Sequence, residues 1–152
     1  MKREHAHIHS FLHSAAILEK RLESLLGTSR IRHRQALVLD ALRQIGPSSQ
    51  KHLAKQFSVS PGTMSSMISR LETLGYVQRE TSPKDRRTDV ISILPDGLTA
   101  LADVAGVWRE GDKTVEDILG PEESRRFFAL AEHVSKALGG GPPKTETSDQ
   151  EN

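Results

Sequence analysis

The stretch from Leu53 to Gly75 constrains the fold most, because it encodes two short helices joined by a tight turn. Ser60 is a preferred N-cap, Pro61 suits the first helical position, and Gly75 is typical of the residue that follows a helix. These signals predict a helix over about residues 60–74. Its apolar side chains recur at helical spacing and form one inward-facing stripe. They are Met64, Met67, Ile68, Leu71 and Leu74.

The opposite face of this helix carries short hydrogen-bonding side chains and one arginine, with no carboxylate among them. A solvated helix face usually mixes Glu with Lys, whereas a face that lies against polyanionic DNA excludes carboxylates. We therefore predict a recognition helix for the major groove of double-stranded DNA. The residues predicted to contact DNA are Ser60, Gly62, Thr63, Ser65, Ser66, Ser69 and Arg70.

Residues 48–57 are predicted to form the first helix of this helix-turn-helix, with Ser48 or Ser49 as its N-cap. In such motifs the first helix crosses the DNA backbone, where polar side chains contact phosphates. The predicted phosphate donors are Ser49, Gln50, Lys51 and Lys55.

After Gly75 the pattern changes to two strand-like segments, 76–80 and 89–94, joined by a basic, Pro-containing loop. A two-stranded hairpin is marginal alone, so it must pack on the preceding helices as the wing of a winged helix, over about residues 76–94. Its tip would reach the adjacent minor groove; the alternative is an exposed loop whose charges only aid solubility. The predicted wing contacts are Lys84, Asp85, Arg86 and Arg87, with Asp85 holding the Arg87 guanidinium in a bidentate pair.

Charge is distributed unevenly, although the 152 residues carry nearly balanced totals of 21 Lys plus Arg and 20 Asp plus Glu. Residues 51–87 contain seven basic and three acidic residues, whereas residues 99–132 contain four basic and eight acidic residues. Positive charge is thus concentrated where DNA would dock.

Helices are predicted on both sides of the winged helix-turn-helix, which spans residues 31–97. An amphipathic helix with a coiled-coil-like seam lies within residues 1–30, and the winged helix-turn-helix itself begins with a further helix from about Arg30 to Ile45. Residues 98–138 form two more helices, the first irregular at Gly106 or Gly111, and residues 139–152 read as a disordered tail. The fold class is mainly α with a small β-hairpin wing (α+β). The end helices have more apolar surface than a small core covers, which predicts a homodimer.

Four histidines, His5, His7, His9 and His13, lie close together near the N-terminus. His9 and His13 are spaced one helical turn apart, as in some metal sites, but no third ligand and no zincin-type Glu accompany them. We therefore expect no metal and no cofactor.

A second cluster, residues 30–34, contains three arginines and His33 at the start of a helix. Cations there oppose the helix dipole, so the cluster is either solvated charge or a functional group that contacts phosphate or rims a ligand cleft.

The sequence contains no cysteine, which excludes disulfides, thiolate metal sites and cysteine redox chemistry in this chain. The N-terminal apolar run is interrupted by polar residues, so it resembles neither a signal peptide nor a membrane span. We expect a cytoplasmic, nucleoid-associated protein with no membrane partner.

Four groups of residues within positions 58–97 together carry a family resemblance. They are Val59-Ser60 with Thr63-Met64-Ser65, Ile68-Ser69-Arg70-Leu71-Glu72 with Leu74-Gly75-Tyr76-Val77, Asp85-Arg86-Arg87, and Ile91-Ser92-Ile93-Leu94-Pro95-Asp96-Gly97. At this spacing they resemble the MarR (multiple antibiotic resistance regulator) family of bacterial winged-helix repressors.

The resemblance implies a homodimer, built from the first and last helices, on a pseudo-palindromic operator. It implies that Arg87 is the wing arginine that enters the minor groove, with Asp85 as its partner. It also implies release of DNA when a small aromatic or anionic effector enters a cleft; ordinary core or interface packing is the alternative role for each residue that would border it. Those residues are Phe11, Leu12, His13, His33 and Trp108.

The predicted function is a sequence-specific DNA-binding transcriptional regulator, a ligand-responsive repressor rather than an enzyme. A winged helix that docks proteins is the alternative, and an acidic or apolar recognition face would have favoured it. A metal-dependent hydrolase that uses the N-terminal histidines lacks a carboxylate base at useful spacing.

Overall fold

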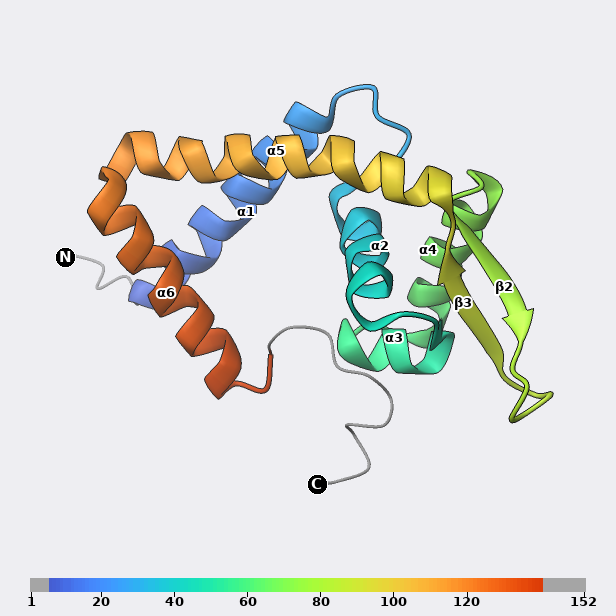
Figure 1. Cartoon of the computed structure of the whole chain (residues 1–152). Coiled ribbons are helices and arrows are strands. Elements are labelled where there is room, and N and C mark those ends of the chain that lie inside the picture. Colours follow the sequence, from blue (N-terminus) through green and yellow to red (C-terminus); the bar gives the residue numbers. More distant parts are fainter. Residues whose placement is uncertain (1–5, 141–152) are drawn as a thin grey trace.

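The structure is a computed structural model that describes residues 6–140. It is mainly helical with one small sheet, as the sequence predicts, and the long helix α5 spans the molecule from the wing to α6 (Figure 1). The elements are α1 (His7–Leu26), α2 (His33–Ile45), β1 (Ser48–Ser49), α3 (Gln50–Gln56), α4 (Pro61–Thr73), β2 (Val77–Thr81), β3 (Asp89–Ile93), α5 (Pro95–Leu119) and α6 (Pro121–Ala137).

The sheet has three antiparallel strands in the order β1-β3-β2. Strands β2 and β3 form the predicted hairpin, in a register that pairs Val77 with Ile93 and Thr81 with Asp89. The third strand, β1, pairs Ser48 with Ile91 and Ser49 with Val90. The prediction that Ser48 or Ser49 caps the first helix of the motif is confirmed at Ser49. The strand formed by these two residues was not predicted, because a two-residue strand has no alternation for a sequence pattern to reveal.

Two further helix predictions need correction. Helix α2 begins at His33 rather than Arg30, and the backbone N–H of His33 donates a hydrogen bond to Oε1 of Glu23 at 2.9 Å. Helix α5 is continuous through Gly106 and Gly111. At Gly111 a Cβ atom would lie 2.7 Å from Cδ2 of Leu22, so this glycine gives α1 a close approach to α5 instead of breaking the helix.

The hydrophobic core is formed mostly by side chains of α2, α3 and α4, and β3 and the first half of α5 pack against them. The predicted stripe of α4 is confirmed: Met64, Ile68 and Leu71 are fully buried, and Met67 and Leu74 are half-buried. This core holds the helix-turn-helix and the base of the wing in one lobe.

Large apolar side chains are exposed on α1, on α6 and at both ends of α5. The exposure agrees with the predicted surplus of apolar surface on the end helices. None of the helices among residues 6–140 is long and apolar enough to cross a bilayer. The exposed apolar residues of these elements are Ile8, Phe11, Leu12, Ile17, Leu25, Leu98, Ile118, Leu119, Phe128, Leu130 and Val134, and Leu138 follows α6.

Candidate nucleic-acid interface

Helix α4 has the capped ends that its sequence predicts. The Ser60 hydroxyl accepts the backbone N–H of Thr63 at 3.1 Å, and Pro61 occupies the first turn. Gly75 follows the helix with a φ of 74°, a left-handed conformation that glycine adopts without strain. These local signals fix where the helix begins and ends, and so which side chains face outward.

The outward face of α4 presents the predicted DNA-contacting side chains. Ser65 is half-buried and the other predicted residues are exposed, while the Ser60 and Thr63 hydroxyls lie 2.9 Å apart. The surface consists of hydroxyl groups, a glycine backbone and one guanidinium, all of which can hydrogen-bond to base edges or phosphates. The exposed residues are Ser60, Gly62, Thr63, Ser66, Ser69 and Arg70.

The four predicted phosphate donors lie in different environments. Lys51 and Lys55 are exposed on α3. Ser49 is buried and caps α3, since its hydroxyl accepts the backbone N–H of His52 at 3.1 Å. Gln50 is half-buried, and its Oε1 accepts a hydrogen bond from Arg79 at 3.1 Å. The side chains of the two lysines are thus accessible to solvent, and Ser49 and Gln50 make contacts within the lobe.

The wing tip is closed by Asp85 in a way that the sequence did not predict. Its Oδ1 accepts the backbone N–H of Arg87 at 2.9 Å, and its Oδ2 accepts the Thr88 hydroxyl at 3.1 Å. The expected bidentate pair with the Arg87 guanidinium was therefore wrong, because the short Asp side chain caps its own turn instead. This leaves the side chains of Lys84, Arg86 and Arg87 exposed at the tip.

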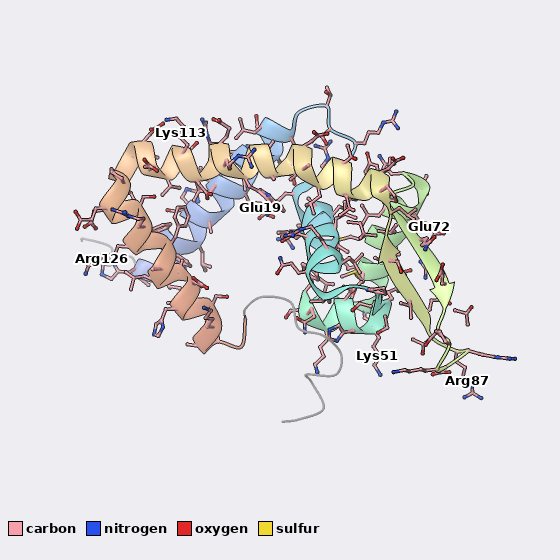
Figure 2. All side chains as sticks on the ribbon, in the orientation of Figure 1. Glu19, Lys51, Glu72, Arg87, Lys113 and Arg126 are labelled. Carbon is pink, nitrogen blue, oxygen red and sulfur yellow. The ribbon has the colours of Figure 1, made fainter. Side chains whose placement is uncertain are left out.

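Basic side chains of α3 and of the wing tip lie at the same end of the lobe. In Figure 2 Lys51 and Arg87 both lie in the lower part of the view, although they come from different elements. Phosphate groups on one duplex would meet positive charge at both places.

Sequence reasoning missed Arg79, a basic residue of β2 that contacts the elements of the candidate interface from within the chain. It is half-buried at the root of the wing, where it contacts Gln50, Glu72 and Asp89. Its only sequence signal was that it is a basic residue on the inward-facing side of a predicted strand. The partners come from three other elements, so local spacing contains no information about them.

Two clefts border the junction between α1 and the helix-turn-helix lobe. One, of about 410 Å³, lies among α1, α2, α5 and Phe128 of α6. The other, of about 520 Å³, lies among α1, α2 and the turn region of the helix-turn-helix. The two clefts share Leu18, Leu22, His33 and Leu37 as lining residues.

Among the predicted effector residues, the structure brings His33 and Trp108 together. The indole N–H of Trp108 donates to Nδ1 of His33 at 3.1 Å, and the rings meet edge to face. His33 lines both clefts and Trp108 lines the smaller one, whereas Phe11, Leu12 and His13 line neither of these two clefts. The latter three are exposed on α1 and stay predictions.

Two arginines of the cluster at residues 30–34, Arg32 and Arg34, are paired with carboxylates of α1. Arg34 donates to Glu19 at 3.0 Å, and Arg32 lies 3.6 Å from Glu23. The hydrogen bond and positive charge of Arg34 lower the pKa of Glu19, and the reverse interaction raises the pKa of Arg34. These pairs rim the larger cleft at Glu19 and Arg34, which agrees with the polar-rim interpretation of this cluster.

No group of three metal-ligating side chains occurs within residues 6–140. Of the N-terminal histidines, His7, His9 and His13 are exposed on α1, and His5 lies outside the described residues.

Comparison with known proteins agrees with this geometry. Residues 31–88 match the model of the MarR family. Three relatives are named as transcriptional regulators or repressors, and each match covers only part of this chain. An uncharacterized HTH-type transcriptional regulator of Bacillus subtilis, YcgE, is 42% identical over 52 residues, which are 34% of each chain. A regulator of Bacillus cereus is 31% identical over 100 residues, 65% of this chain and 66% of that one.

The repressor NicR of Pseudomonas putida is 36% identical over 67 residues, 44% of this chain and 42% of its own length. The matched part thus spans between about a third and two thirds of these relatives.

Solved structures share the fold at low sequence identity. MepR of S. aureus, in a complex with DNA, superposes with a TM-score of 0.74 at 20% identity, covering 89% of this chain and 99% of MepR. BpsR of Bordetella bronchiseptica, whose DNA binding is regulated by 6-hydroxynicotinic acid, has a TM-score of 0.76 at 21% identity, covering 89% and 96% of the two chains. The winged helix-turn-helix of this chain thus matches the MarR family model across residues 31–88, and the chain shares its whole fold with these structures.

Proposed function

We propose that this protein is a homodimeric, effector-responsive repressor that binds a pseudo-palindromic operator in double-stranded DNA. The observation that carries the proposal is the exposed face of α4, which presents hydroxyls and Arg70 outward, while the wing that packs against α4 ends in an exposed basic tip. MepR, which shares the fold, was solved bound to DNA.

Affinity would come mainly from Lys and Arg contacts to phosphate, and specificity from base contacts in the major groove. Lys51, Lys55 and the wing cations supply the affinity, because each neutralised phosphate releases condensed counterions. Ser69 and Arg70 supply the specificity, at roughly 1–3 kcal/mol for each good bidentate contact with a base. Action at an operator would place the protein on the chromosome.

A second copy of the chain would supply the other recognition helix. The exposed apolar side chains of α1 and α6 support such a dimer, since burial of apolar surface drives stable association. The two recognition helices would have to stand about one DNA turn apart, roughly 34 Å, to occupy both half-sites. A change in this separation would release the operator.

The two clefts beside α1 and α2 support an effector role. They join the helices of the proposed dimer interface to the helix-turn-helix lobe, so an occupant would alter the relation between the two. The apolar lining and the nearby His33 and Arg21 suit a small aromatic molecule that carries an acid group. NicR is a repressor and BpsR responds to an aromatic acid, which supports this reading.

The chain contains one tryptophan, so Trp108 is a clean reporter of this cleft. Titration with benzoate, as a small aromatic anion, should change the fluorescence of the wild type. Leu37→Phe should weaken that response, because the larger side chain fills the shared wall of the clefts without adding a second tryptophan. A response that persists unchanged in Leu37→Phe would locate binding elsewhere.

The DNA proposal is tested by selecting duplexes from a random pool with the full-length protein and measuring binding to the enriched sequence. We expect an inverted repeat whose half-site centres are about 10 base pairs apart. Ser69→Ala and Arg70→Ala should change the preference at particular half-site positions. An absence of any enriched sequence would refute the proposal and would favour the protein-docking alternative.

A further inference from the structure

The guanidinium of Arg79 joins four elements at the root of the wing. From β2, its Nε donates to Oε2 of Glu72 near the end of α4 at 3.2 Å. Its Nη1 donates to Oε1 of Gln50, the first residue of α3, at 3.1 Å. The same Nη1 lies 3.8 Å from Oδ2 of Asp89, where β3 leaves the wing loop.

We propose that Arg79 is a positioning residue for DNA recognition, which sets the angle of the wing relative to the recognition helix. This inference rests on the proposed DNA-binding function. It assigns to Arg79 no contact with DNA; the residue acts through the placement of Arg87.

The wing needs such a constraint because most of its length is only two strands wide. The third strand, β1, pairs only with Val90 and Ile91. From Asp89 outward, β2 and β3 have only each other, and isolated two-stranded ribbons are marginal and twist readily. Arg79 pairs with Ile91 in the register and reaches Asp89, so it acts where the three-stranded part ends.

On the helix side, Arg79 binds Glu72, which lies one turn beyond Ser69 and next but one to Arg70. The guanidinium also compensates the only carboxylate of α4. One planar group with several fixed donors can hold both Glu72 and Gln50, and a guanidinium keeps that geometry better than an ammonium group does. The contact therefore relates the direction of the wing to the direction of the base-reading side chains.

The same contacts contribute little to overall stability. The side chains of Arg79, Glu72 and Asp89 are 30%, 48% and 45% exposed, and ion pairs so accessible to water add little to folding free energy. A neutral replacement should therefore leave the fold intact while the wing loses its fixed angle. This separates a positioning role from a purely structural one.

The first test is a double-mutant cycle on the selected operator. Arg79→Gln should weaken operator binding by roughly tenfold in the wild-type background, in the range of measured couplings between interacting residues. In an Arg87→Ala background the same change should cost less than about twofold, because the wing contact is already lost. Arg79→Lys, which keeps the charge without the fork of donors, should fall between wild type and Arg79→Gln.

Arg43 offers a matched control. It makes a comparable exposed contact, donating from Nε and Nη2 to Oδ1 of Asp40 at 3.1 and 2.8 Å, but it lies on α2. Arg43→Gln should leave operator affinity and its salt dependence unchanged. Thermal unfolding of both variants should remain close to that of the wild type.

The second test measures the wing without DNA. Because the chain has no cysteine, spin labels on Lys84→Cys and Ser66→Cys report the distance between the wing tip and α4 alone. Dilution with unlabelled protein removes distances between protomers. Arg79→Gln should broaden this distance distribution, whereas Arg43→Gln should not.

The two readings separate the possible failures. An unchanged distance distribution, or an equal affinity loss with and without Arg87, overturns the role of Arg79. If the wild type forms no site-specific complex, the proposed function fails, and the distance measurement still decides whether Arg79 fixes the wing.

Discussion

Removal of the Arg87 guanidinium is the sharpest perturbation of the proposed wing contact. The side chain is exposed at the wing tip, and Asp85 binds its backbone N–H rather than its guanidinium. Arg87→Ala therefore removes a charge without breaking a contact of that charge with Asp85. The Asp85 turn should survive, because neither of its hydrogen bonds uses the side chain of Arg87.

The expected change in the salt dependence of operator binding follows from counterion release. One cation per protomer makes two per dimer, and each phosphate contact contributes about 0.9 to the slope of log affinity against log salt, so the slope should fall by roughly 1.8. Between 50 and 200 mM salt, a fourfold change, the ratio of wild-type to variant affinity should then shrink by about twelvefold. The variant should bind more weakly at low salt and nearly as well at high salt.

Fluorescence anisotropy with the selected operator, at five or more salt concentrations, measures this slope. Arg109→Ala removes an exposed arginine from the acidic segment of α5 and should leave the slope unchanged. An Arg87→Ala slope equal to that of the wild type, with any loss of affinity, would show that the wing arginine does not neutralise DNA charge.

Three further predictions concern the stability of the folded protein. Ser60→Ala removes the cap of α4 and should cost about 1 kcal/mol in chemical unfolding, whereas Ser66→Ala, at an exposed position of the same helix, should change stability little. Gly97→Ala should destabilise by roughly 1–3 kcal/mol, because the new Cβ would clash with the carbonyl oxygen of Tyr76; Gly106→Ala, which has room, should not. Because the pKa of Glu19 is lowered, its pair with Arg34 adds stability above the unfolded-state pKa, near 4.5, and this stability is lost as pH falls through the folded-state pKa. Arg34→Gln should therefore reduce the loss of unfolding free energy on acidification. An unchanged loss on acidification would rule the pair out as a contributor.

The recognition helix was predictable because its signals are local. Ser60, Pro61 and Gly75 act on the backbone within a turn of their own positions, and the apolar stripe repeats with the helical period. Burial of Met64, Ile68 and Leu71 then left the other face outward without further choice. The resemblance at residues 58–97 added the family and the role of the wing.

A competing local hydrogen bond explains why the predicted contact between Asp85 and the Arg87 guanidinium was wrong. Asp85 was expected to bind the Arg87 guanidinium, but its carboxylate accepts the backbone N–H of the same residue. Both partners lie within two residues, and the backbone bond requires no ordering of a long side chain. The sequence indicated the right pair of residues and the wrong pair of atoms.

The sequence by itself determined which segments are helical, which face of α4 is polar, and where positive charge gathers, since caps, periodicity and charge act over a few residues. Only the tertiary structure decided that Ser48 and Ser49 join the sheet, that Trp108 donates to His33, and that Arg79 reaches Gln50. The last two contacts join residues 75 and 29 positions apart. Such contacts depend on how whole elements pack, and packing is set by the summed burial of many side chains rather than by any local pattern.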